Sequence, residues 1–523
     1  MEYRCSMQIN VLEYLEKTVL RVPEKVAYSD GTASLTFRQV FDQSRAVGTC
    51  LKKSGYTREP VVVFMRKHPD VAAAFFGTVY AGNFYVPIDE EMPSYRVELI
   101  FKTLHPRVLI CDRETQKLAE QFSCQGQIYL YEEMIQTAIE EECLAKVRRE
   151  AIDTDPIYIV FTSGSTGVPK GVAACHRSVI DYIEHLSDVL EFSQETVFGN
   201  QAPLYFDACL KELYPTIKFG ATTYLIPKEL FMFPIKLVEF LNQYQINTIC
   251  WVVSALTMIS GLGVLEKVKP NYLKTIAFGS EVFPIKQFRI WRNVLPYAVF
   301  VNLYGPTEAT GMSCYYRVER EFLEEEAIPI GQPFPNTRIL LLDQDNRLVQ
   351  QGETGEICIV GTPLTLGYYK DFERTEQVFV QNPLNTFYPE RMYRTGDLGR
   401  YNERGELLFI SRKDNQIKHM GHRIELGEIE ANVNLLEEVL ISCCIYSSKK
   451  DKIVLYYVGE IEKAVMAARL KKCLPRYMMP NWIEPLEQMP LTPNGKVDRV
   501  FLKRRYEEGE GEHKAGENEN RRN

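Results

Sequence analysis

The chain has 523 residues, of which 45% are hydrophobic and 25% charged, an ordinary balance for a globular protein. At a prior of roughly 150 residues per domain, this length allows about two to four domains. The net charge of −8, from 61 basic and 69 acidic residues, gives no electrostatic case for binding nucleic acid or an anionic membrane. No apolar run approaches the ~18 residues that span a membrane, and the N-terminal segment MEYRCSMQINVLEYLEK lacks the layout of a signal peptide.

The cysteines and histidines indicate neither a disulfide framework nor a metal site. The 13 cysteines are scattered without a C-x-x-C pair, and the seven histidines lack the spacing of metal ligands. Only Cys443 and Cys444 adjoin, and neighbours in sequence rarely form a disulfide. We therefore expect reduced, buried cysteines in a cytoplasmic protein.

Three apolar runs each end directly in a polar loop that contains glycine. They are IYIVF (157–161) before TSGSTG, LKTIAF (273–278) before GSE, and YAVFVNL (297–303) before YGPTE. After the first loop, residues 176–190 place their aliphatic side chains on one helical face. Strands alternating with helices indicate a parallel α/β architecture. Because ligands bind at the carboxyl ends of such strands, we expect the three loops to meet around one ligand.

The pattern changes after residue 413, where a second and smaller domain is predicted to begin. EEVLISCCIYSS and DKIVLYYVGE have the composition of strands, and AVMAARLKKCL that of a short helix. The last residues are dense in charge and have a single aliphatic residue, an alanine. We predict a large N-terminal domain at 1–413, a small α+β domain at 414–505 and a disordered polar tail at 506–523.

The stretch TSGSTGVPKG (162–171) has the composition of a phosphate-binding loop. Its backbone N–H groups and hydroxyls can surround an anion, and Lys170 adds positive charge. It is not a P-loop, because Pro169 precedes the lysine and Gly171 follows it. On composition alone, an ordinary surface loop is the alternative.

The stretch NLYGPTEAT (302–310) adds residues suited to a nucleotide and its metal ion. Tyr304 could stack on a base, and Glu308 could hold a hard cation through oxygen. The alternative is a turn built on the Gly-Pro pair, with the glutamate simply exposed.

Two later stretches offer one candidate residue each. In YRTGD (393–397), Asp397 could accept hydrogen bonds from a ribose, or it is only a turn residue. In LTPNGKVDR (491–499), an Asn-Gly turn displays Lys496 at a loop tip, where most lysines are merely solvated.

In this order and spacing, the four stretches resemble the adenylate-forming superfamily of acyl-CoA synthetases, luciferases and amino-acid-activating adenylation domains. The resemblance covers nearly the whole chain and is strongest for stand-alone adenylation domains and D-alanine–carrier-protein ligases. It implies an α/β fold with a large multi-subdomain N-terminal domain and a small mobile α+β C-terminal domain, joined at a hinge on Asp414. The matching segments also include LTFRQV (35–40), YAGNFYVPID (80–89), GEICIVGTPLTLGYY (355–369), GHRIELGEIE (421–430) and LPRYMMP (474–480).

The resemblance implies two half-reactions. A carboxylate first attacks the α-phosphate of ATP, with Mg²⁺ bound, to give an acyl-adenylate and pyrophosphate; the small domain then rotates and a thiol takes the acyl group. Such chemistry depends on positioning and charge neutralisation. Lys496 would bridge the carboxylate and the α-phosphate and withdraw when the domain rotates. Lys170, Thr307 and Glu308 would also be catalytic, with Glu308 as the Mg²⁺ ligand.

By the same resemblance, one set of positions would bind ATP and AMP. Phe409 is one of them, and because many relatives have tyrosine there, any contact through a hydroxyl is lost in this chain. The set is Thr162, Ser163, Gly164, Ser165, Thr166, Gly167, Gly279, Asn302, Tyr304, Gly305, Pro306, Thr307, Asp397, Phe409 and Arg412.

A second set would bind an amino acid. Asp207 falls where the family's aspartate binds the substrate's α-ammonium group, although it could instead cap a helix. Lys211 is a charged residue in an otherwise apolar pocket and needs a partner, and a substrate carboxylate would serve, which points to glutamate or aspartate as the substrate. The alternative is that Lys211 turns to solvent or pairs with Glu212 or Glu239. The bulk of Phe278 points instead to a small substrate such as alanine, serine or aspartate. The other positions are Ala208, Trp251, Ile276, Leu303, Gly311, Met312 and Lys496.

We expect a stand-alone enzyme, because too few residues precede Asp30 for a condensation module and too few follow Arg505 for a carrier domain. Its partners would be an amino acid and a separate phosphopantetheinylated carrier protein, with no nucleic acid and no membrane. A fragment of a larger synthetase is the alternative. Two other functions compete: ligation to CoA or to an amine, and a catalytically silent scaffold, which the presence of Lys496, Glu308 and Asp397 opposes.

Overall fold

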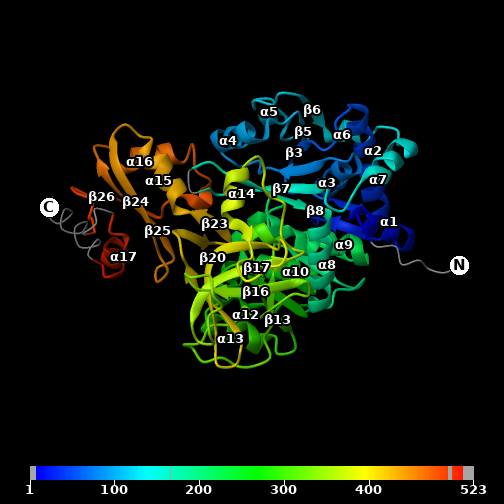
Figure 1. The fold of residues 1–523 in the computed structure, drawn as a ribbon. Coiled ribbons are helices and arrows are strands. Elements are labelled where there is room, and N and C mark those ends of the chain that lie inside the picture. Colours follow the sequence, from blue (N-terminus) through cyan, green and yellow to red (C-terminus); the bar gives the residue numbers. More distant parts are fainter. Residues whose placement is uncertain (1–7, 165–166, 493–496, 510–523) are drawn as a thin grey trace. The chain divides into compact units, whose positions relative to one another are not determined.

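The computed structural model describes residues 8–164, 167–492 and 497–509, and it divides into two compact units (Figure 1). The first unit comprises residues 1–90, 101–161 and 171–413. The second comprises 91–100, 162–170 and 414–523. The C-terminal unit therefore begins at Asp414 and includes two short segments that the sequence prediction had assigned to the large domain.

The largest sheet in the described part of the chain has nine strands and belongs to the first unit. Its central strands run parallel, whereas β2 and β14 run antiparallel to their neighbours. The spatial order is β15 (Gln332–Pro333), β14 (Cys314–Arg317), β13 (Val299–Tyr304), β12 (Thr275–Gly279), β11 (Thr248–Val252), β9 (Val197–Asn200), β10 (Thr222–Leu225), β1 (Val26–Ser29) and β2 (Ser34–Thr36).

Two further sheets complete the strands of the first unit. One has seven described strands: β18 (Gly367–Tyr368), β8 (Lys170–Cys175), β7 (Pro156–Thr162), β4 (Phe84–Pro87), β3 (Pro60–Phe64), β5 (Val108–Cys111) and β6 (Gln127–Leu130). The other is antiparallel: β16 (Thr337–Leu342), β17 (Thr354–Gly361), β20 (Arg391–Tyr401) and β19 (Phe379–Gln381), with β21 (Leu407–Arg412) paired to β20.

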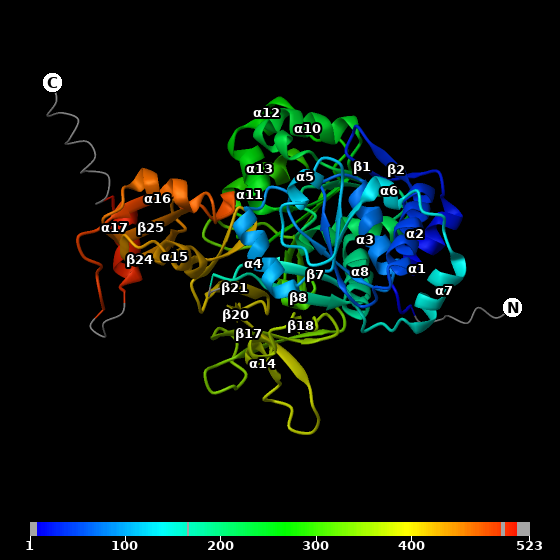
Figure 2. The ribbon, with the colours of Figure 1, turned by 90° about the horizontal axis from the view of Figure 1, so that it is seen from above.

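Helices cover the nine-stranded and seven-stranded sheets, and α2 and α3 lie side by side in both ribbon views (Figures 1 and 2). A capping box starts α2: the Thr36 side chain accepts from the Gln39 amide, and the Gln39 side chain accepts from the Thr36 amide. The helices are α1 (Leu12–Arg21), α2 (Phe37–Lys53), α3 (Asp70–Tyr80), α4 (Ser94–Leu104), α5 (Gln116–Ala119), α6 (Tyr131–Met134), α7 (Glu141–Glu150), α8 (His176–Leu190), α9 (Leu210–Phe219), α10 (Pro234–Gln243), α11 (Val253–Gly261), α12 (Val264–Lys267), α13 (Ile285–Val294) and α14 (Phe372–Val378). Short 3₁₀ turns are η1 (Asp207–Cys209), η2 (Lys228–Met232) and η3 (Thr307–Ala309).

The nine-stranded sheet is buried on both faces. Cys250 and Ala277 belong to a core shared with α1, α2, α3, α8 and α9, whereas Trp251 and Phe278 belong to a second core beneath α10, α11 and α13. Neighbouring side chains along a strand point to opposite faces, so one strand supplies both cores. Burial on both faces explains why these strands have continuous apolar runs in the sequence.

The second unit is α+β within its described residues. It contains a hairpin of β22 (Gln416–His419) and β23 (His422–Glu425) and a sheet of β24 (Val439–Ser447), β25 (Lys452–Gly459) and β26 (Trp482–Pro485). Its helical elements are α15 (Leu426–Asn434), α16 (Lys463–Leu470), η4 (Arg476–Met478) and α17 (Arg499–Glu507). The hairpin and α15 were not anticipated from the charged segment that encodes them.

The helix α17 continues past the predicted start of the disordered tail. The side chain of Asp498 accepts from the Phe501 amide at the helix start, and the carbonyl of Tyr506 accepts from Lys450 at 3.1 Å. Tyr506 and Glu507 are therefore helical, which corrects the boundary predicted at 506. The remainder of the predicted tail, from residue 510, lies outside the described residues.

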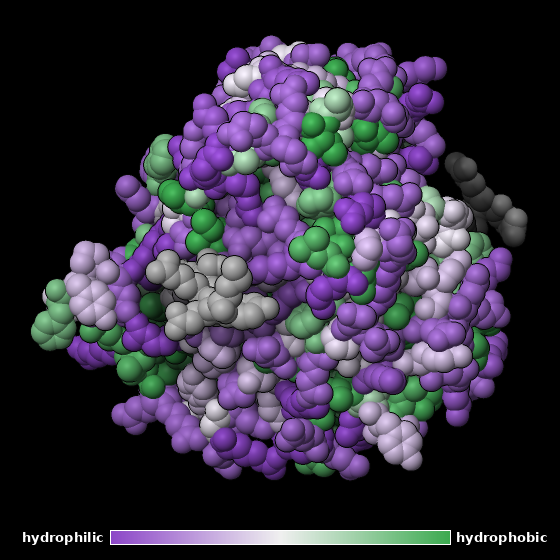
Figure 3. All heavy atoms as spheres, turned by 90° about the vertical axis from the view of Figure 1, so that its right-hand side faces the viewer, coloured by the Kyte–Doolittle hydropathy of each residue, from purple (hydrophilic) through white to green (hydrophobic). Residues whose placement is uncertain are grey.

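One face of the molecule is largely hydrophilic, with hydrophobic side chains scattered over it in small groups (Figure 3). Within the described ranges, no helix is both long enough and apolar enough to cross a membrane.

Candidate functional site

The carboxyl ends of three parallel strands bring the predicted adenine and amino-acid positions together. In the register of the sheet, Trp251 of β11 lies beside Phe278 of β12, and Phe278 lies beside Asn302 of β13. Gly279 lies beside Leu303 in the same register. The loops after β12 and β13 therefore leave one edge of one sheet, as expected, whereas the first polar loop follows β7 in a different sheet. That all three loops surround one ligand stays a prediction.

Behind this edge, Tyr304 and Arg412 hold the carboxylate of Asp397. The Tyr304 hydroxyl donates to Oδ2 and the Arg412 guanidinium donates to Oδ1, both at 2.5 Å. Asp397 is only 3% exposed, and it lies directly across the β20–β21 pair from Arg412. Burial, followed by the charge of Asp397, raises the pKa of the Tyr304 phenol well above its usual value. The hydrogen bond fixes the position of the Tyr304 hydroxyl, and stacking of the ring on a base stays a prediction.

Asn302 and Phe409 occupy the same region. The Asn302 amide donates to the carbonyl of Pro329 at 2.8 Å, which fixes the side-chain orientation. Phe409 packs against the cluster that contains Tyr304, Ile330 and Leu407. A phenylalanine at this position therefore has an apolar packing role, since its surroundings are hydrophobic.

Glu308 is fully buried in η3 at the end of the β13 loop. The Tyr368 hydroxyl donates to its Oε1 at 2.7 Å, and the Thr365 amide donates to its main-chain carbonyl at 3.0 Å. Thr307, which precedes it, is also buried. No cluster of three or more His, Cys, Asp or Glu suited to a metal occurs in the ranges the structure describes. Mg²⁺ commonly takes one or two protein carboxylates plus substrate phosphates, so a single glutamate is compatible with such an ion.

Gly305 lies where the chain has no room for a side chain. A Cβ atom built on it would lie 2.5 Å from both the Gly311 carbonyl oxygen and the Met312 Cα. A Cβ on Gly279 would lie 2.3 Å from the Leu303 carbonyl oxygen. Both predicted glycines are thus required by close backbone approach, and Pro306 follows the first of them directly.

The predicted phosphate loop is grouped with the second unit, and its described residues contact β23 and α15 through two polar groups. The Ser163 hydroxyl donates to the carbonyl of Arg423 at 2.8 Å, and the Gly164 amide donates to the Glu428 carboxylate at 3.2 Å. Glu428 also forms a buried ion pair with Arg96. A loop amide that binds a carboxylate here has the donor chemistry that a phosphate needs.

Several predicted residues lie at the margin of this loop or beyond the described ranges. Thr162 ends β7, Gly167 has a positive φ of 84°, and Lys170 begins β8. Ser165, Thr166 and Lys496 lie outside the described residues. Their predicted contacts with the phosphates stay predictions.

Five of the predicted amino-acid-binding residues line one small cavity at the strand ends. They are Lys211, Trp251, Phe278, Leu303 and Met312, and Cys250, Val252, Ala277, Gly279 and Ser280 complete the lining. The open space is about 10 Å³, close to what one water molecule needs. A substrate side chain would therefore enter only if lining groups move.

Lys211 points into this cavity and is 6% exposed, which rules out the expectation that it turns to solvent. Among the described residues it forms no ion pair with Glu212 or Glu239, the two partners considered from the sequence.

Cys250 lines the same cavity and was not predicted from the sequence. It belongs to the same core as Leu303 and Met312, while Trp251 packs in the second core and donates its indole N–H to the Gly199 carbonyl at 2.7 Å.

Asp207 is the first residue of η1, and the N-cap position is occupied by Phe206. Asp207 therefore does not cap the turn, which removes the alternative considered for it. Burial, followed by the charge of Asp207, raises the pKa of Tyr158, whose buried hydroxyl has no hydrogen-bond partner in the described structure. Ala208 is its neighbour in η1, whereas Ile276 and Gly311 are buried without lining the cavity.

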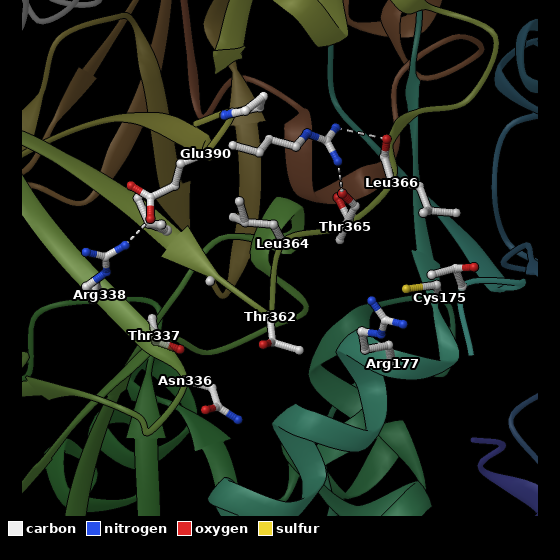
Figure 4. Close-up of a pocket in the computed structure, with 15 residues that line it drawn as sticks. Cys175, Arg177, Asn336, Thr337, Arg338, Thr362, Leu364, Thr365, Leu366 and Glu390 are labelled. Atoms are coloured by element: carbon white, nitrogen blue, oxygen red, sulfur yellow. Dashed lines mark hydrogen bonds and ion pairs between the residues drawn. The ribbon is translucent and has the colours of Figure 1, made fainter. Parts of the chain in front are cut away.

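A larger cavity of about 690 Å³ lies elsewhere in the first unit (Figure 4). Its arginines are already engaged: Arg338 pairs with Glu390, and Arg391 donates to the carbonyls of Thr365 and Leu366. None of the residues predicted for a site lines this cavity, so volume alone does not mark the functional site.

Comparison with known proteins assigns the family. A model of the AMP-binding enzyme family matches residues 15–369, more than half of the chain. The chain belongs to the AMP-binding enzyme family. Bacitracin synthase 1 of Bacillus licheniformis is 30% identical over 516 residues, which are 97% of this chain but only 10% of that synthase. The adenylate-forming ligase assignment made from the motifs is therefore confirmed, while the acceptor and the substrate are not decided by it.

Solved structures of other proteins share the fold. An artificially fused adenylation–PCP di-domain protein from Klebsiella oxytoca superposes with a TM-score of 0.78 at 19% identity, covering 91% of this chain and 94% of the other. A double mutant of o-succinylbenzoate CoA synthetase from Bacillus subtilis gives 0.80 at 19% identity, covering 95% and 99%. At this identity the likeness shows the fold alone. It confirms the α/β class with a large N-terminal and a small C-terminal domain.

Proposed function

We propose that this AMP-binding enzyme activates an amino acid with ATP and passes it to the phosphopantetheine thiol of a separate carrier protein. The observation that supports this most directly is the buried Lys211 at a cavity that is also lined by Leu303 and Met312, the residues on either side of the segment with Tyr304 and Glu308. The first step forms a bond from the amino-acid carboxylate oxygen to the α-phosphorus and breaks the bond to the leaving pyrophosphate. Transfer then joins the acyl carbon to the thiol sulfur and releases AMP.

The nucleotide would be held by residues whose orientation is already fixed. Asp397 would accept from the ribose hydroxyls, with Arg412 and Tyr304 keeping its carboxylate oriented. Asn302 would lie at the adenine, and the amides of the 162–170 loop with Lys170 would hold the β- and γ-phosphates. Preorganised groups of this kind stabilise charge without reorganising during the reaction.

Mg²⁺, when bound, would neutralise phosphate charge. Glu308 would be its protein ligand, and Tyr368 would orient that carboxylate through its hydroxyl. Lys496 would approach the substrate carboxylate and the α-phosphate from the C-terminal domain, with Thr307 and Lys170 beside the phosphates and Asp414 as the hinge.

For the substrate we propose an acidic amino acid, glutamate or aspartate, and next a small one, alanine or serine. Asp207 would receive the α-ammonium group. Lys211 has a buried positive charge in the cavity without an ion-pair partner among the described residues, and a side-chain carboxylate would supply one. The limited space beside Phe278 favours the shorter substrates.

The acceptor has a competing candidate. The CoA synthetase with a TM-score of 0.80 keeps ligation to CoA open, because the fold is common to both chemistries. We propose a separate carrier protein as the acceptor because Asp207 falls where the amino-acid-activating members of the family have an aspartate, and such members load carrier proteins. A scaffold without catalysis is disfavoured by the presence of Glu308, Asp397 and Lys496. The reaction is expected in the cytoplasm; the described cysteines are all free thiols.

The test is ATP–pyrophosphate exchange with each L- and D-amino acid, measured for the wild type, Lys211→Ala and Lys496→Ala. Exchange with glutamate or aspartate that falls with Lys211→Ala supports the proposal. Exchange with alanine or serine that is unaffected by Lys211→Ala keeps the activation chemistry and removes the acidic substrate. No exchange with any amino acid contradicts amino-acid activation. Loading of a purified carrier protein against loading of CoA then decides the acceptor.

A further inference from the structure

Arg499 is the first residue of α17 and follows Lys496 by three positions in the sequence. Its guanidinium binds the carboxylate of Glu430 with two nitrogens: Nη1 donates to Oε1 at 2.6 Å, and Nη2 donates to Oε2 at 2.8 Å. Nη1 also donates to the main-chain carbonyl of Cys444 at 2.7 Å. A contact of this two-pronged, charged kind fixes orientation as well as distance. The two side chains are 31% and 14% exposed, so salt screens the pair less than it would at an open surface.

The contact joins three elements of the second unit. Glu430 belongs to α15 and Cys444 to β24, and both α15 and α17 lie beside β24 (Figures 1 and 2). Among the described strands β24 is the outermost of its sheet, and an outer strand has a row of backbone groups without a strand partner. The Cys444 N–H donates to Oε1 of Glu430 at 2.6 Å, and its carbonyl accepts from Arg499. One carboxylate and one guanidinium therefore tie the start of α17 to a helix and a strand from earlier in the chain.

The chain is also held on the other side of residues 493–496. Leu491 pairs with Val497 in an isolated antiparallel bridge, and the Asp498 amide donates to the carbonyl of Pro490 at 2.9 Å. Residues 493–496 lie outside the described ranges, but their described neighbours are thus fixed on both sides. Three residues of chain span at most about 11 Å, so the position of residue 499 restricts where residue 496 can lie.

The attachment of α17 to the sheet does not depend on Arg499 alone. Leu502 is fully buried in an apolar cluster on the sheet. Near the other end of the helix, Arg505 donates to Glu484 of β26 at 2.9 Å, and these two side chains are 29% and 13% exposed. The helix therefore has ion pairs of similar exposure near both ends, and the pair of Arg499 is the one beside Lys496 in the sequence.

We propose that Arg499 is a positioning residue for adenylation, whose contacts with Glu430 and the Cys444 carbonyl set the position of the segment that carries Lys496. Arg499 touches no reacting group and acts through Lys496. A misplacement of about 1 Å can cost about a hundredfold in rate, even when the change is far from the reacting atoms. This inference rests on the proposed function, because it takes Lys496 to stabilise charge at the α-phosphate.

The experiment compares two arginines of one helix. The kcat and KM of ATP–pyrophosphate exchange, with the amino acid that the wild type activates, are measured for Arg499→Met and for Arg505→Met as the matched control. We expect Arg499→Met to lower kcat by about 10- to 100-fold with little change in either KM, because Lys496 would act on the transition state. Arg505→Met should keep kcat near the wild-type value. Arg499→Lys, which keeps the charge but loses the two-pronged contact, should lie between Arg499→Met and the wild type.

A double variant tests whether Arg499 acts through Lys496. In the Lys496→Ala background, Arg499→Met should lower exchange further by less than about twofold, because the group that it positions is already absent. A general weakening of the fold would instead multiply the two losses. Arg499→Met should also still load the acceptor from a supplied aminoacyl-adenylate, whereas a misfolded domain would not.

Glu430→Gln is a second route to the same contact. It removes the negative charge that Arg499 binds but keeps the shape of the side chain, so it serves if thermal unfolding shows that Arg499→Met does not fold. We expect it to lower kcat in the same direction as Arg499→Met, by a smaller factor.

Four results would overturn the inference. They are a kcat of Arg499→Met equal to that of Arg505→Met, losses that multiply in the double variant, adenylate loading that falls as far as exchange does, and wild-type exchange in Lys496→Ala. Each would leave the proposed activation of an amino acid standing, because the wild type would still exchange. Absence of exchange by the wild type with every amino acid would instead remove the proposed function, and this inference with it.

Discussion

The Tyr304 hydroxyl donates a 2.5 Å hydrogen bond to the Asp397 carboxylate, which lies 93 residues further along the chain. The bond joins the end of β13 to the β20–β21 pair, where Arg412 binds the other carboxylate oxygen. Two sheets of the first unit are thereby locked together at the point where the sequence predicted a ribose contact.

Replacement of Asp397 by alanine should lower kcat/KM for ATP in pyrophosphate exchange by about a hundredfold, the typical loss when a preorganised polar contact is removed. It would also leave Arg412, whose side chain is 12% exposed, without this carboxylate. Tyr304→Phe, which deletes a single hydroxyl, should cost about 1 kcal/mol of stability and much less activity. Calorimetric titration with AMP checks the binding part directly. Equal affinity of Asp397→Ala and wild type for AMP would exclude a ribose role.

Glu308→Gln should raise the Mg²⁺ concentration that gives half-maximal exchange by about tenfold or more, because the amide has no negative charge to offer a hard cation. Tyr368→Phe is the matched control: it removes the 2.7 Å hydrogen bond to Glu308 but keeps the carboxylate. We expect it to shift the Mg²⁺ dependence less than Glu308→Gln does. If both variants follow the wild-type Mg²⁺ curve, Glu308 is a structural carboxylate and not a metal ligand.

Lys170→Ala and Lys496→Ala should each reduce exchange by about 10²- to 10³-fold, because each removes a positive charge that would stabilise the negative charge on the phosphates in the transition state. The two differ in the second half-reaction. Lys496 is predicted to act only in adenylation, so a chemically supplied aminoacyl-adenylate should still load the acceptor with Lys496→Ala. Loading that fails to the same extent as exchange would contradict a separate adenylation role for this lysine.

His176 should make the protein less stable in mild acid. It is 3% exposed, and burial, followed by the charge of Arg148, lowers its pKa from 6.5 to about 3. The unfolded chain therefore takes up a proton between pH 6.5 and 3 that the folded chain does not, so stability is complete above pH 6.5 and falls as the pH drops. From pH 7 to pH 5.5 this amounts to about 1 kcal/mol.

Urea unfolding at several pH values measures that effect as the difference between wild type and His176→Gln. The difference should shrink by about 1 kcal/mol as the pH falls from 7 to 5.5. His105→Asn, a change at an exposed histidine with a positive φ of 52° that asparagine tolerates, should show no such trend. A His176→Gln curve parallel to the wild type would mean that the buried ring is protonated in the folded state.

Gly305→Ala should destabilise the protein by more than about 1 kcal/mol, because its Cβ would lie 2.5 Å from backbone atoms that cannot rotate away. The control is Gly261→Ala in a helix, where the nearest atom to an added Cβ is 3.9 Å away and the substitution should be tolerated. Gly352 would be a poor control because its positive φ of 89° disfavours alanine. Thermal unfolding of the two variants checks the contrast. Similar melting temperatures would show that the loop relaxes around the added methyl group.

From sequence alone we could predict the strands β7, β12 and β13 to within one residue at their carboxyl ends, the helix at 176–190, and the polar stretches that contain Tyr304, Glu308 and Asp397. These are local features: continuous apolar runs, helical periodicity and turn residues act over a few neighbours. The four motifs in order also gave the adenylate-forming family, because their spacing reflects one fold.

Which distant groups meet depends on how the sheets assemble. The chain contains no local signal that Lys67 donates to the carbonyls of Asn200 and Ile226, or that Tyr304 binds Asp397, since these contacts join segments far apart in sequence. The face on which Cys250 and Trp251 point is likewise set by the pairing of β11, because one residue along a strand reverses the side. Long-range pairing and burial on both faces of a sheet are properties of the assembled fold, which local patterns do not encode.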